Sequence, residues 1–551
     1  MSAAHWGHRA ARAVRAQGVE TLFTLTGGHL FPLYDGARAA GIRLVDVRHE
    51  ASAAFAAEGW ARLGRRAGVA AVTAGPGVFN AVGGLASAAH NGSPVLLLGG
   101  RAPSATWGLG ALQEVDHVPV VTPLAKHAAT VTGRVAEHVA RAIGQALAPP
   151  RGPVFLDIPV DLPPDDDDED GDHADGGPGP LPSVMSPDQD AVQAILGALS
   201  RATRPVLVAG SNVYLDGAWE AMRTFAEAAR LPVLTNGMGR GTIPADHPLA
   251  FARARQTATA EADLVIVAGT PLDFRLSFGW RFAPDAVVVH LDSHPDLVGL
   301  AGEQRHPAGA RGADIRLGAD LRLTFAALAE AAPRGPAASG WVETLRAEED
   351  ERGRAAVAAP PPRTGPIHPV HLYAELARLA DRDAVVVGDG GDFVSWAGRE
   401  LRSWVPGAWL DPGPLGSLGC GPGYAIAAKL LHPSRQVILL LGDGAFGFAG
   451  MEIDTMVRHA LPVVCIVGNN GVWGLERAMM REMLGYDLAA SLRPETRYDL
   501  VAEGLGAYGE LVRTPAGLRP ALERAFGAGV PAVLNVQIDP EAGYPRTTGL
   551  H

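Results

Sequence analysis

Short apolar runs rich in Val, Ile and Leu recur along the whole chain and alternate with alanine-rich stretches of helical character. Apolar strands of this kind, separated by helices, are typical of parallel sheets that are covered on both faces. The sequence therefore predicts an α/β fold made of three doubly wound parallel-sheet domains, with ligands at the carboxyl ends of the strands. The predicted strands are residues 69–74, 94–100, 153–160, 205–210, 263–269, 286–292, 384–390, 436–444, 462–470 and 531–539.

Two segments of linker composition divide the chain. Residues 163–182 contain six consecutive acids that repel one another, and residues 351–366 end in a proline-rich stretch. We interpret the acidic segment as a solvated spacer rather than an interaction tail. The expected domains are residues 1–162, 183–350 and 367–551, and three domains suit a chain of 551 residues.

Composition excludes several classes of protein. The net charge of −12 argues against nucleic acid or an anionic membrane as the main partner. The two cysteines, Cys420 and Cys465, have no CxxC spacing, so we expect neither a disulfide framework nor a zinc site. No apolar run reaches the roughly 18 residues of a membrane span, and the first residues do not resemble a secretion signal. We therefore expect a soluble, cytoplasmic protein.

The most specific pattern lies at the ends of two predicted strands. One strand runs into Gly442-Asp443-Gly444, and the next ends at Asn469-Asn470, with 24 residues between Gly444 and Asn469. Neighbouring strand ends can present the aspartate and the second asparagine to one point. Both offer hard oxygen ligands, which suit Mg²⁺ bound together with phosphate oxygens, and glycine permits the close approach of a diphosphate.

The same glycines also satisfy a GxGxxG pattern through Gly442, Gly444 and Gly447. A dinucleotide site of that type needs an acid for the ribose near the end of the following strand. That strand ends in Gly468, Asn469 and Asn470, without a carboxylate. We therefore prefer the magnesium–diphosphate interpretation.

This motif resembles the diphosphate–magnesium motif of thiamine-diphosphate-dependent enzymes, and the resemblance extends over nearly the whole chain. It implies thiamine diphosphate and Mg²⁺ as cofactors, with the metal held by Asp443, Asn470 and the main-chain carbonyl of Val472. It also implies cofactor contacts from Gly442, Gly444 and Ala445.

Residues 42–62 are similar to the family segment that carries a glutamate, here Glu50, where a strand gives way to a helix. Such an acid can also serve only a helix N-terminus. The resemblance implies that Glu50 protonates the aminopyrimidine ring of the cofactor, which then acts as an electron sink. In the family this glutamate meets the metal-binding domain of another subunit, so a homo-oligomer with sites at the subunit interface is implied.

Two further segments resemble cofactor-binding segments. In residues 412–429, Leu418 corresponds to the apolar wedge under the two cofactor rings, and the Gly416 carbonyl to the acceptor of the 4′-amino group. Leu418 can equally be ordinary core. Gly391, Asp392 and Phe393 match the segment that contacts the diphosphate, although an acid at position 392 is unusual beside an anion.

The domain order and residues 27–36, 73–84 and 110–117 resemble the group of acetolactate synthase, oxalyl-CoA decarboxylase and 2-hydroxyacyl-CoA lyase. The resemblance implies that Gln113 hydrogen-bonds the substrate. His29 lies on a loop that faces the cofactor in relatives, or is a polar loop residue. Glu476 stands where pyruvate decarboxylases carry a catalytic acid, or is a solvated helix residue paired with Arg477 or Arg481.

Two regions bear on the substrate. In acyl-CoA relatives the C-terminus covers the site, and here that tail, residues 543–551, carries Arg546; a frayed terminus is the alternative. Residues 269–280 and 290–296 correspond to segments that bind ADP or FAD in relatives, with Arg275 and Asp292 as the expected contacts, unless both are packing loops.

Three functions remain open for the small-molecule substrate. The sequence favours reversible cleavage of a 2-hydroxyacyl-CoA to formyl-CoA and an aldehyde or ketone, through Glu476 and the C-terminal tail. The alternative is acetolactate synthase, which joins two pyruvates with loss of CO₂. A catalytically dead cofactor-binding regulator is the third, and the presence of Glu50 argues against it.

Overall fold

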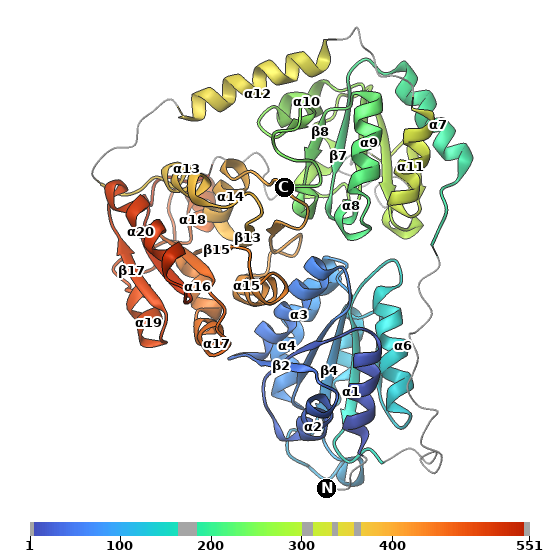
Figure 1. The fold of residues 1–551 in the computed structure, drawn as a ribbon, viewed down its shortest axis with the longest axis vertical. Helices are drawn as coiled ribbons and strands as arrows, with labels where there is room; N and C mark the ends of the chain where they lie inside the picture. The colour runs from blue at the N-terminus through green and yellow to red at the C-terminus, as the bar shows by residue number, and fades with distance from the viewer. Residues whose placement is uncertain (1–4, 164–183, 300–311, 333–339, 358–364, 545–551) are drawn as a thin grey trace.

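The computed structural model describes residues 5–163, 184–299, 312–332, 340–357 and 365–544. These ranges form three six-stranded sheets whose paired strands are all parallel, with helices packed on their faces (Figure 1). The predicted α/β class is confirmed, and each of the ten apolar runs forms a strand.

The first sheet has the strand order β2-β1-β3-β4-β6-β5. One face is covered by α1, α2 and α6, and the other by α3 and α4. Its strands are β1 (Thr21–Thr24), β2 (Arg43–Asp46), β3 (Gly68–Val72), β4 (Val95–Arg101), β5 (His127–Thr130) and β6 (Val154–Pro159). Its helices are α1 (Trp6–Ala16), α2 (Phe31–Ala39), α3 (Glu50–Gly64), α4 (Pro76–His90), α5 (Val118–Val121) and α6 (Val135–Leu147), with short 3₁₀ turns at Gly28–Leu30, Ser104–Thr106 and Thr122–Leu124.

The second sheet has the order β12-β11-β10-β7-β8-β9, with α7, α9 and α11 on one face and α10 and α12 on the other. Its strands are β7 (Pro205–Ala209), β8 (Val233–Thr235), β9 (Ala250–Phe251), β10 (Leu264–Ala268), β11 (Val287–Asp292) and β12 (Ile315–Gly318). Its helices are α7 (Gln189–Arg201), α8 (Ser211–Leu215), α9 (Trp219–Ala229), α10 (Arg255–Glu261), α11 (Leu321–Ala331) and α12 (Trp341–Val357), with 3₁₀ turns at Gly237–Gly239, Phe274–Gly279 and Pro295–Leu297.

The third sheet has the order β14-β13-β15-β16-β18-β17. Its strands are β13 (Val385–Asp389), β14 (Trp409–Leu410), β15 (Val437–Gly442), β16 (Val464–Asn469), β17 (Tyr508–Val512) and β18 (Ala532–Gln537). Its helices are α13 (Pro369–Leu379), α14 (Gly391–Glu400), α15 (Cys420–Leu431), α16 (Asp443–Ala449), α17 (Glu452–Arg458), α18 (Gly474–Leu484), α19 (Tyr498–Gly504) and α20 (Pro515–Gly527). The helical stretch that the sequence indicates near residues 450–459 forms α17, and a further short helix that the sequence did not indicate, α16, begins at Asp443 itself.

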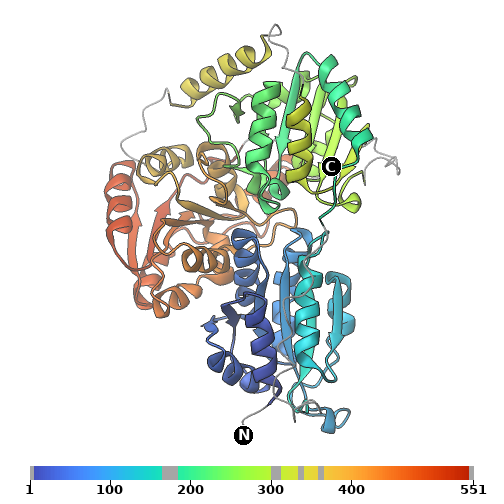
Figure 2. The same ribbon diagram turned by 45° about the vertical axis from the view of Figure 1, so that its right-hand side comes forward.

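A shared core joins the first and third domains, which lie against each other in both views (Figures 1 and 2). Helix α3 packs on α15 so closely that a Cβ on Gly59 would lie 2.9 Å from the Cα of Tyr424. Glycine is therefore required at this crossing. Arg62 adds a hydrogen bond from its guanidinium to the carbonyl of Asp411, at 2.8 Å. These contacts fix how the first domain sits against the loop that leads into α15.

The predicted linkers fall mostly outside the described residues. Of residues 163–182 the structure describes only Pro163, and of residues 351–366 it describes 351–357 and 365–366. The first of these pieces continues α12, which extends from the second domain towards the third (Figure 1). In the described ranges no helix has both the length and the apolar character that crossing a membrane requires.

Candidate functional site

The two strand ends that carry the most specific motif lie side by side. Strands β15 and β16 pair in parallel with Gly442 opposite Gly468, so Asp443 and Asn470 follow at one edge of the sheet. A cavity of about 1240 Å³ opens there, between the second and third domains. Its lining includes the following residues predicted to bind cofactor, metal or substrate: Gly391, Asp392, Phe393, Gly416, Leu418, Gly442, Asp443, Gly444, Ala445, Asn470, Val472 and Glu476.

Asp443 is a buried carboxyl group with 3 % of its surface exposed. Its Oδ2 accepts a hydrogen bond from the amide of Gly471 at 2.9 Å, and burial raises its pKa to about 6. Among the described side chains, no Lys, Arg or His forms an ion pair with it. Because a buried carboxylate without a counter-charge is unfavourable, this position suits a bound cation.

Asn470 and Val472 complete the same edge of the cavity. The Oδ1 of Asn470 accepts a hydrogen bond from the Val472 amide at 3.1 Å, which folds residues 470–472 into a tight turn. Asp443, Asn470 and Val472 line one edge of the cavity, and carboxylate, amide and carbonyl oxygens are the ligands that Mg²⁺ requires. The residues present therefore fit a magnesium ion.

The segment after β13 has room for an anion. Gly390 and Gly391 have positive φ, and a Cβ on Gly391 would meet no atom within 4 Å, so the backbone is open to a ligand. Asp392, which looked out of place beside a diphosphate, accepts a hydrogen bond through Oδ1 from the Tyr544 amide at 2.7 Å. Its carboxylate therefore holds the last described part of the chain. Phe393 is buried against Gly468 and Tyr373.

Leu418, the residue expected to lie under the cofactor rings, is on the loop that leads into α15. Its Cδ2 would be only 2.5 Å from a Cβ on Gly390, and it lines the cavity while packing on the core shared with the first domain.

The loop that carries Leu418 is held in place by Asp389, a residue that the sequence analysis did not identify. Its two carboxylate oxygens accept hydrogen bonds from the amides of Gly419, at 2.8 Å, and Gly421, at 3.0 Å. Burial raises the pKa of Asp389 to about 7.

Glu50 is the first residue of α3 and is 8 % exposed. Its Oε2 accepts a hydrogen bond at 3.0 Å from the side-chain amide of Asn80, on the neighbouring helix α4. Asn80 lies in the segment 73–84 that supported the family resemblance, but its contact with the glutamate could not be seen from the sequence.

His29 and Gln113 lie at the carboxyl edge of the first sheet as well. His29 is buried, its Nδ1 lies 3.1 Å from Thr73 Oγ1, and burial lowers its pKa, which favours the neutral ring. Gln113 has a φ of +59°, and a Cβ on Gly75 would lie 3.0 Å from its Cβ. The loop that carries Gln113 therefore packs directly on the turn that starts α4.

A buried histidine that the sequence did not reveal supports this turn. His117 Nε2 accepts a hydrogen bond from the Gly75 amide at 2.8 Å, so its proton resides on Nδ1 and is donated to Asp157 Oδ1 at 3.0 Å. Arg101 in turn donates to Asp157 Oδ2 at 2.5 Å. This series of hydrogen bonds, from Arg101 through Asp157 and His117, fixes the position of Gly75.

The two groups of candidate residues do not share one cavity within this chain. The described lining of the cavity beside Asp443 does not include Glu50, His29 or Gln113. Glu476 does line it and is exposed; its neighbours Arg477 and Arg481 pair with Asp487 and Glu541 instead. Arg546 and the rest of the tail lie outside the described residues.

The middle domain contributes a strongly basic wall to the same cavity. Arg240 and Arg255 are partly buried there, and desolvation, reinforced by Arg240, lowers the pKa of Arg255 to about 10. Of the two expected nucleotide contacts, Arg275 lines the cavity but is paired with Asp273. Asp292 is buried away from it, where it accepts a hydrogen bond from Asn212. The arginines in the lining are Arg240, Arg253, Arg255, Arg275, Arg281, Arg352 and Arg399.

Comparison with protein families identifies the class of protein to which this chain belongs. The N-terminal, central and C-terminal domains of thiamine pyrophosphate enzymes match residues 5–120, 192–326 and 389–536. The chain belongs to this family of thiamine-diphosphate-dependent enzymes.

Within this family, the chain is similar to several named proteins. The chain is 49 % identical, over 99 % of its length and 98 % of theirs, to a probable acetolactate synthase of Mycobacterium bovis and an acetolactate synthase large subunit of Mycobacterium tuberculosis. It is 35 % identical to human 2-hydroxyacyl-CoA lyase 2, over 93 % of this chain and 85 % of that one. Among solved structures, a thiamine-diphosphate-dependent 4-hydroxybenzoylformate decarboxylase of Rhodococcus jostii shares the fold, with a TM-score of 0.82, 23 % identity and coverage of 97 % and 99 %.

Proposed function

We propose that Asp443, Asn470 and the Val472 carbonyl hold Mg²⁺, and that the glycines at positions 391, 442 and 444 receive the diphosphate of thiamine diphosphate. The observation that carries this proposal is the buried Asp443 carboxyl, which has a raised pKa and no cationic partner among the described side chains. Calorimetry tests it directly: thiamine diphosphate should bind only when Mg²⁺ is supplied.

Glu50 is the proposed proton donor to the aminopyrimidine. When bound, the cofactor supplies a nucleophilic carbon that accepts the electron pair of the bond being broken. The role of Glu50 is to hold a proton close to that ring. Asn80 donates a hydrogen bond to Oε2 of Glu50, so the proton would be carried by the other oxygen, Oε1. A buried carboxyl beside a ring nitrogen is a suitable acid–base group.

A complete site then requires a second copy of the chain. Glu50 and Gln113 belong to one group of residues and Asp443 to another, and they line different places in one protomer. Each group is bordered by exposed apolar side chains, which is typical of a protein–protein interface. These are Phe79, Leu109 and Leu112 near the first group, and Leu415, Phe448 and Met451 near the second. We infer a homo-oligomer in which Glu50 of one copy faces Asp443 of another.

For the reaction itself, we propose decarboxylation of a 2-oxoacid and transfer of the remaining acyl unit to a second 2-oxoacid, as in acetolactate synthase. The 49 % identity over almost the whole chain supports this choice over the lyase that the sequence alone favoured. Gln113 would hydrogen-bond the substrate, with His29 behind it as a neutral polar group. Glu476, exposed in the cavity, would donate or accept the substrate's proton.

The 2-hydroxyacyl-CoA lyase reaction remains the second candidate, because the arginine-rich wall suits the phosphates of coenzyme A. It is also named for relatives at 33–36 % identity. The same arginines would serve a bound ADP or FAD, so the wall by itself does not choose among these ligands.

One comparison distinguishes the candidates. The holoenzyme is incubated with pyruvate alone and, separately, with formyl-CoA and a ketone. Acetolactate from pyruvate supports the synthase, and a new 2-hydroxyacyl-CoA supports the lyase. Cofactor binding without turnover in either assay would instead support the regulatory alternative. An absorption spectrum of the purified protein shows whether flavin is bound.

A further inference from the structure

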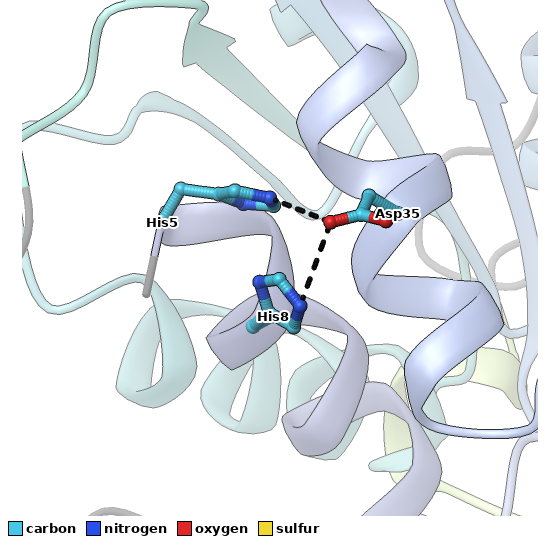
Figure 3. A group of neighbouring side chains, drawn as sticks. All are labelled: His5, His8 and Asp35. Carbon is cyan, nitrogen blue, oxygen red and sulfur yellow. Dashed lines mark hydrogen bonds and ion pairs between the residues drawn. The ribbon is translucent and has the colours of Figure 1, made fainter. Parts of the chain in front are cut away.

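Two histidines and one aspartate meet near the N-terminus, far along the chain from the proposed catalytic residues of the third domain. His5 and His8 lie at the start of α1, and Asp35 lies on α2 (Figure 3). The Oδ2 of Asp35 is 3.2 Å from His5 Nε2 and 3.6 Å from His8 Nε2. Among the described residues this is the one group of three His, Cys, Asp or Glu side chains close enough to share a metal ion.

The distances from Asp35 to the two histidines suit a tetrahedral metal site. Zinc lies about 2.0–2.1 Å from nitrogen or oxygen ligands, so two ligand atoms of a tetrahedral site are about 3.3 Å apart. The two nitrogen–oxygen separations of 3.2 and 3.6 Å lie on either side of that value. The longer one exceeds an ordinary hydrogen bond, so a hydrogen bond to Asp35 does not account for the orientation of His8.

The backbone beside these ligands is rigid. A Cβ on Gly7 would lie 1.9 Å from the Pro32 carbonyl oxygen, and one on Gly36 would lie 2.1 Å from the Gly7 carbonyl oxygen. Helices α1 and α2 are therefore in backbone contact at the residues next to His8 and Asp35. Trp6, between the two histidines, is buried and donates a hydrogen bond to the Val160 carbonyl at 3.1 Å. Ligands on rigid elements lose little entropy when they bind a metal.

The charge of the carboxylate is also appropriate. Asp35 is 46 % exposed, and an ordinary aspartate of this kind is ionised at neutral pH, as a metal ligand must be. Arg38 approaches the other carboxylate oxygen, Oδ1, at 3.7 Å, and is 87 % exposed. Oδ2 stays directed at the two imidazoles, as Figure 3 shows.

We propose that His5, His8 and Asp35 bind a divalent cation of the zinc type, with water at the fourth position. Imidazole nitrogens select zinc, cobalt or nickel over magnesium, so this site is chemically distinct from the oxygen site at Asp443. The ion would join the start of α1 to α2 and stabilise the first domain.

Cobalt is the probe, because tetrahedral Co²⁺ with nitrogen ligands absorbs visible light. The protein, free of any affinity tag, is treated with a chelator, loaded with excess Mg²⁺ and thiamine diphosphate, and titrated with Co²⁺. We expect one absorbing Co²⁺ per chain, which Zn²⁺ displaces. Asp35→Asn and His8→Ala should each weaken binding at least about tenfold, since even outer-shell changes cost that much.

His138→Ala is the matched control, because it removes a histidine of the same domain that hydrogen-bonds the Arg134 carbonyl and is not part of the proposed site. This variant should bind Co²⁺ as the unchanged protein does. Thermal unfolding in chelator shows whether each variant is folded. If His8→Ala does not fold, the test depends on the Asp35→Asn variant, whose side chain has nearly the same shape. Failure of the unchanged protein to bind Co²⁺, or equal binding by Asp35→Asn, would overturn the proposal.

Discussion

Asn80, on α4, donates a hydrogen bond at 3.0 Å to Glu50, the first residue of α3. If Glu50 is the proton donor, Glu50→Gln keeps the shape of the side chain and removes the acid. We expect kcat to fall by about 10²–10⁴-fold, the usual contribution of a general acid–base group. Thiamine diphosphate uptake, measured by calorimetry, should change little. A variant with normal turnover would show that Glu50 only serves the helix terminus.

The side-chain amide of Asn80, which hydrogen-bonds Glu50, should matter less for turnover than the acid itself. Asn80→Ala removes one hydrogen bond to a charged group, a loss of about 1.5–3 kcal/mol, or about 10- to 150-fold if it falls wholly on the transition state. We expect kcat to fall within that range. Asn80→Ala added to Glu50→Gln should cost little more, because both changes act through the same carboxyl group. Additive losses in the double variant would contradict this arrangement.

Asp443 makes the stability of the metal-free protein depend on pH. Its pKa is about 6 when folded, above the ordinary 3.8, so its contribution to stability is complete below about pH 4 and is lost as the pH rises through 6. In chelator at pH 8, Asp443→Asn should therefore be more stable than the unchanged protein, by up to about 2–3 kcal/mol. At pH 4 the difference should disappear. Denaturant unfolding at the two pH values measures both.

Magnesium should reverse that order. The ion neutralises the Asp443 carboxylate, so Mg²⁺ with thiamine diphosphate should stabilise the unchanged protein and leave Asp443→Asn nearly unaffected. Asp381→Asn, an exposed change in the same domain, is the control and should respond as the unchanged protein does. Equal stabilisation of Asp443→Asn would place the metal elsewhere.

The sequence predicted the strands and the metal motif because both are local patterns. An apolar run such as residues 436–444 predicts a buried strand without information from the rest of the chain. The end of that parallel strand then fixes where Asp443 must lie. The helix expected near residues 450–459 is present as α17, but the short helix before it, α16, was not predicted. Glycines at 444, 447 and 450 gave no signal that a helix begins at the aspartate itself.

The supporting residues could not be predicted in the same way. His117 and Asp157 are 40 positions apart, and Asp389 reaches glycines some 30 positions further on. Nothing in a local pattern indicates such a contact, because it depends on how two segments pack. Asp392 shows the same limit. Its acid appeared unsuitable beside a diphosphate until the structure showed it bonded to the amide of Tyr544.

Asp389 should control the loop that carries Leu418. Both its oxygens accept main-chain hydrogen bonds, whereas in Asp389→Asn one oxygen becomes an amide that opposes the N–H of Gly419 or Gly421. We expect a loss of stability of about 1–3 kcal/mol, the cost of a buried unpaired donor. Cofactor affinity should also fall, since the loop lines the cavity. Unfolding and calorimetry check the two effects, and a variant as stable as the unchanged protein would show that these bonds are dispensable.

The role of His117 can be tested by replacing it with glutamine or with asparagine, whose side-chain amides differ in length. In His117→Gln the side-chain oxygen can replace Nε2 and accept from the Gly75 amide, whereas in His117→Asn the amide can replace only the Nδ1 donor to Asp157. If the bond to Gly75 positions Gln113, kcat/KM should fall about 5- to 100-fold in His117→Asn, for a buried donor left unpaired, and much less in His117→Gln. Both variants should melt at similar temperatures, because each retains one of the two bonds. Equal losses of kcat/KM in the two variants would assign His117 a purely structural role.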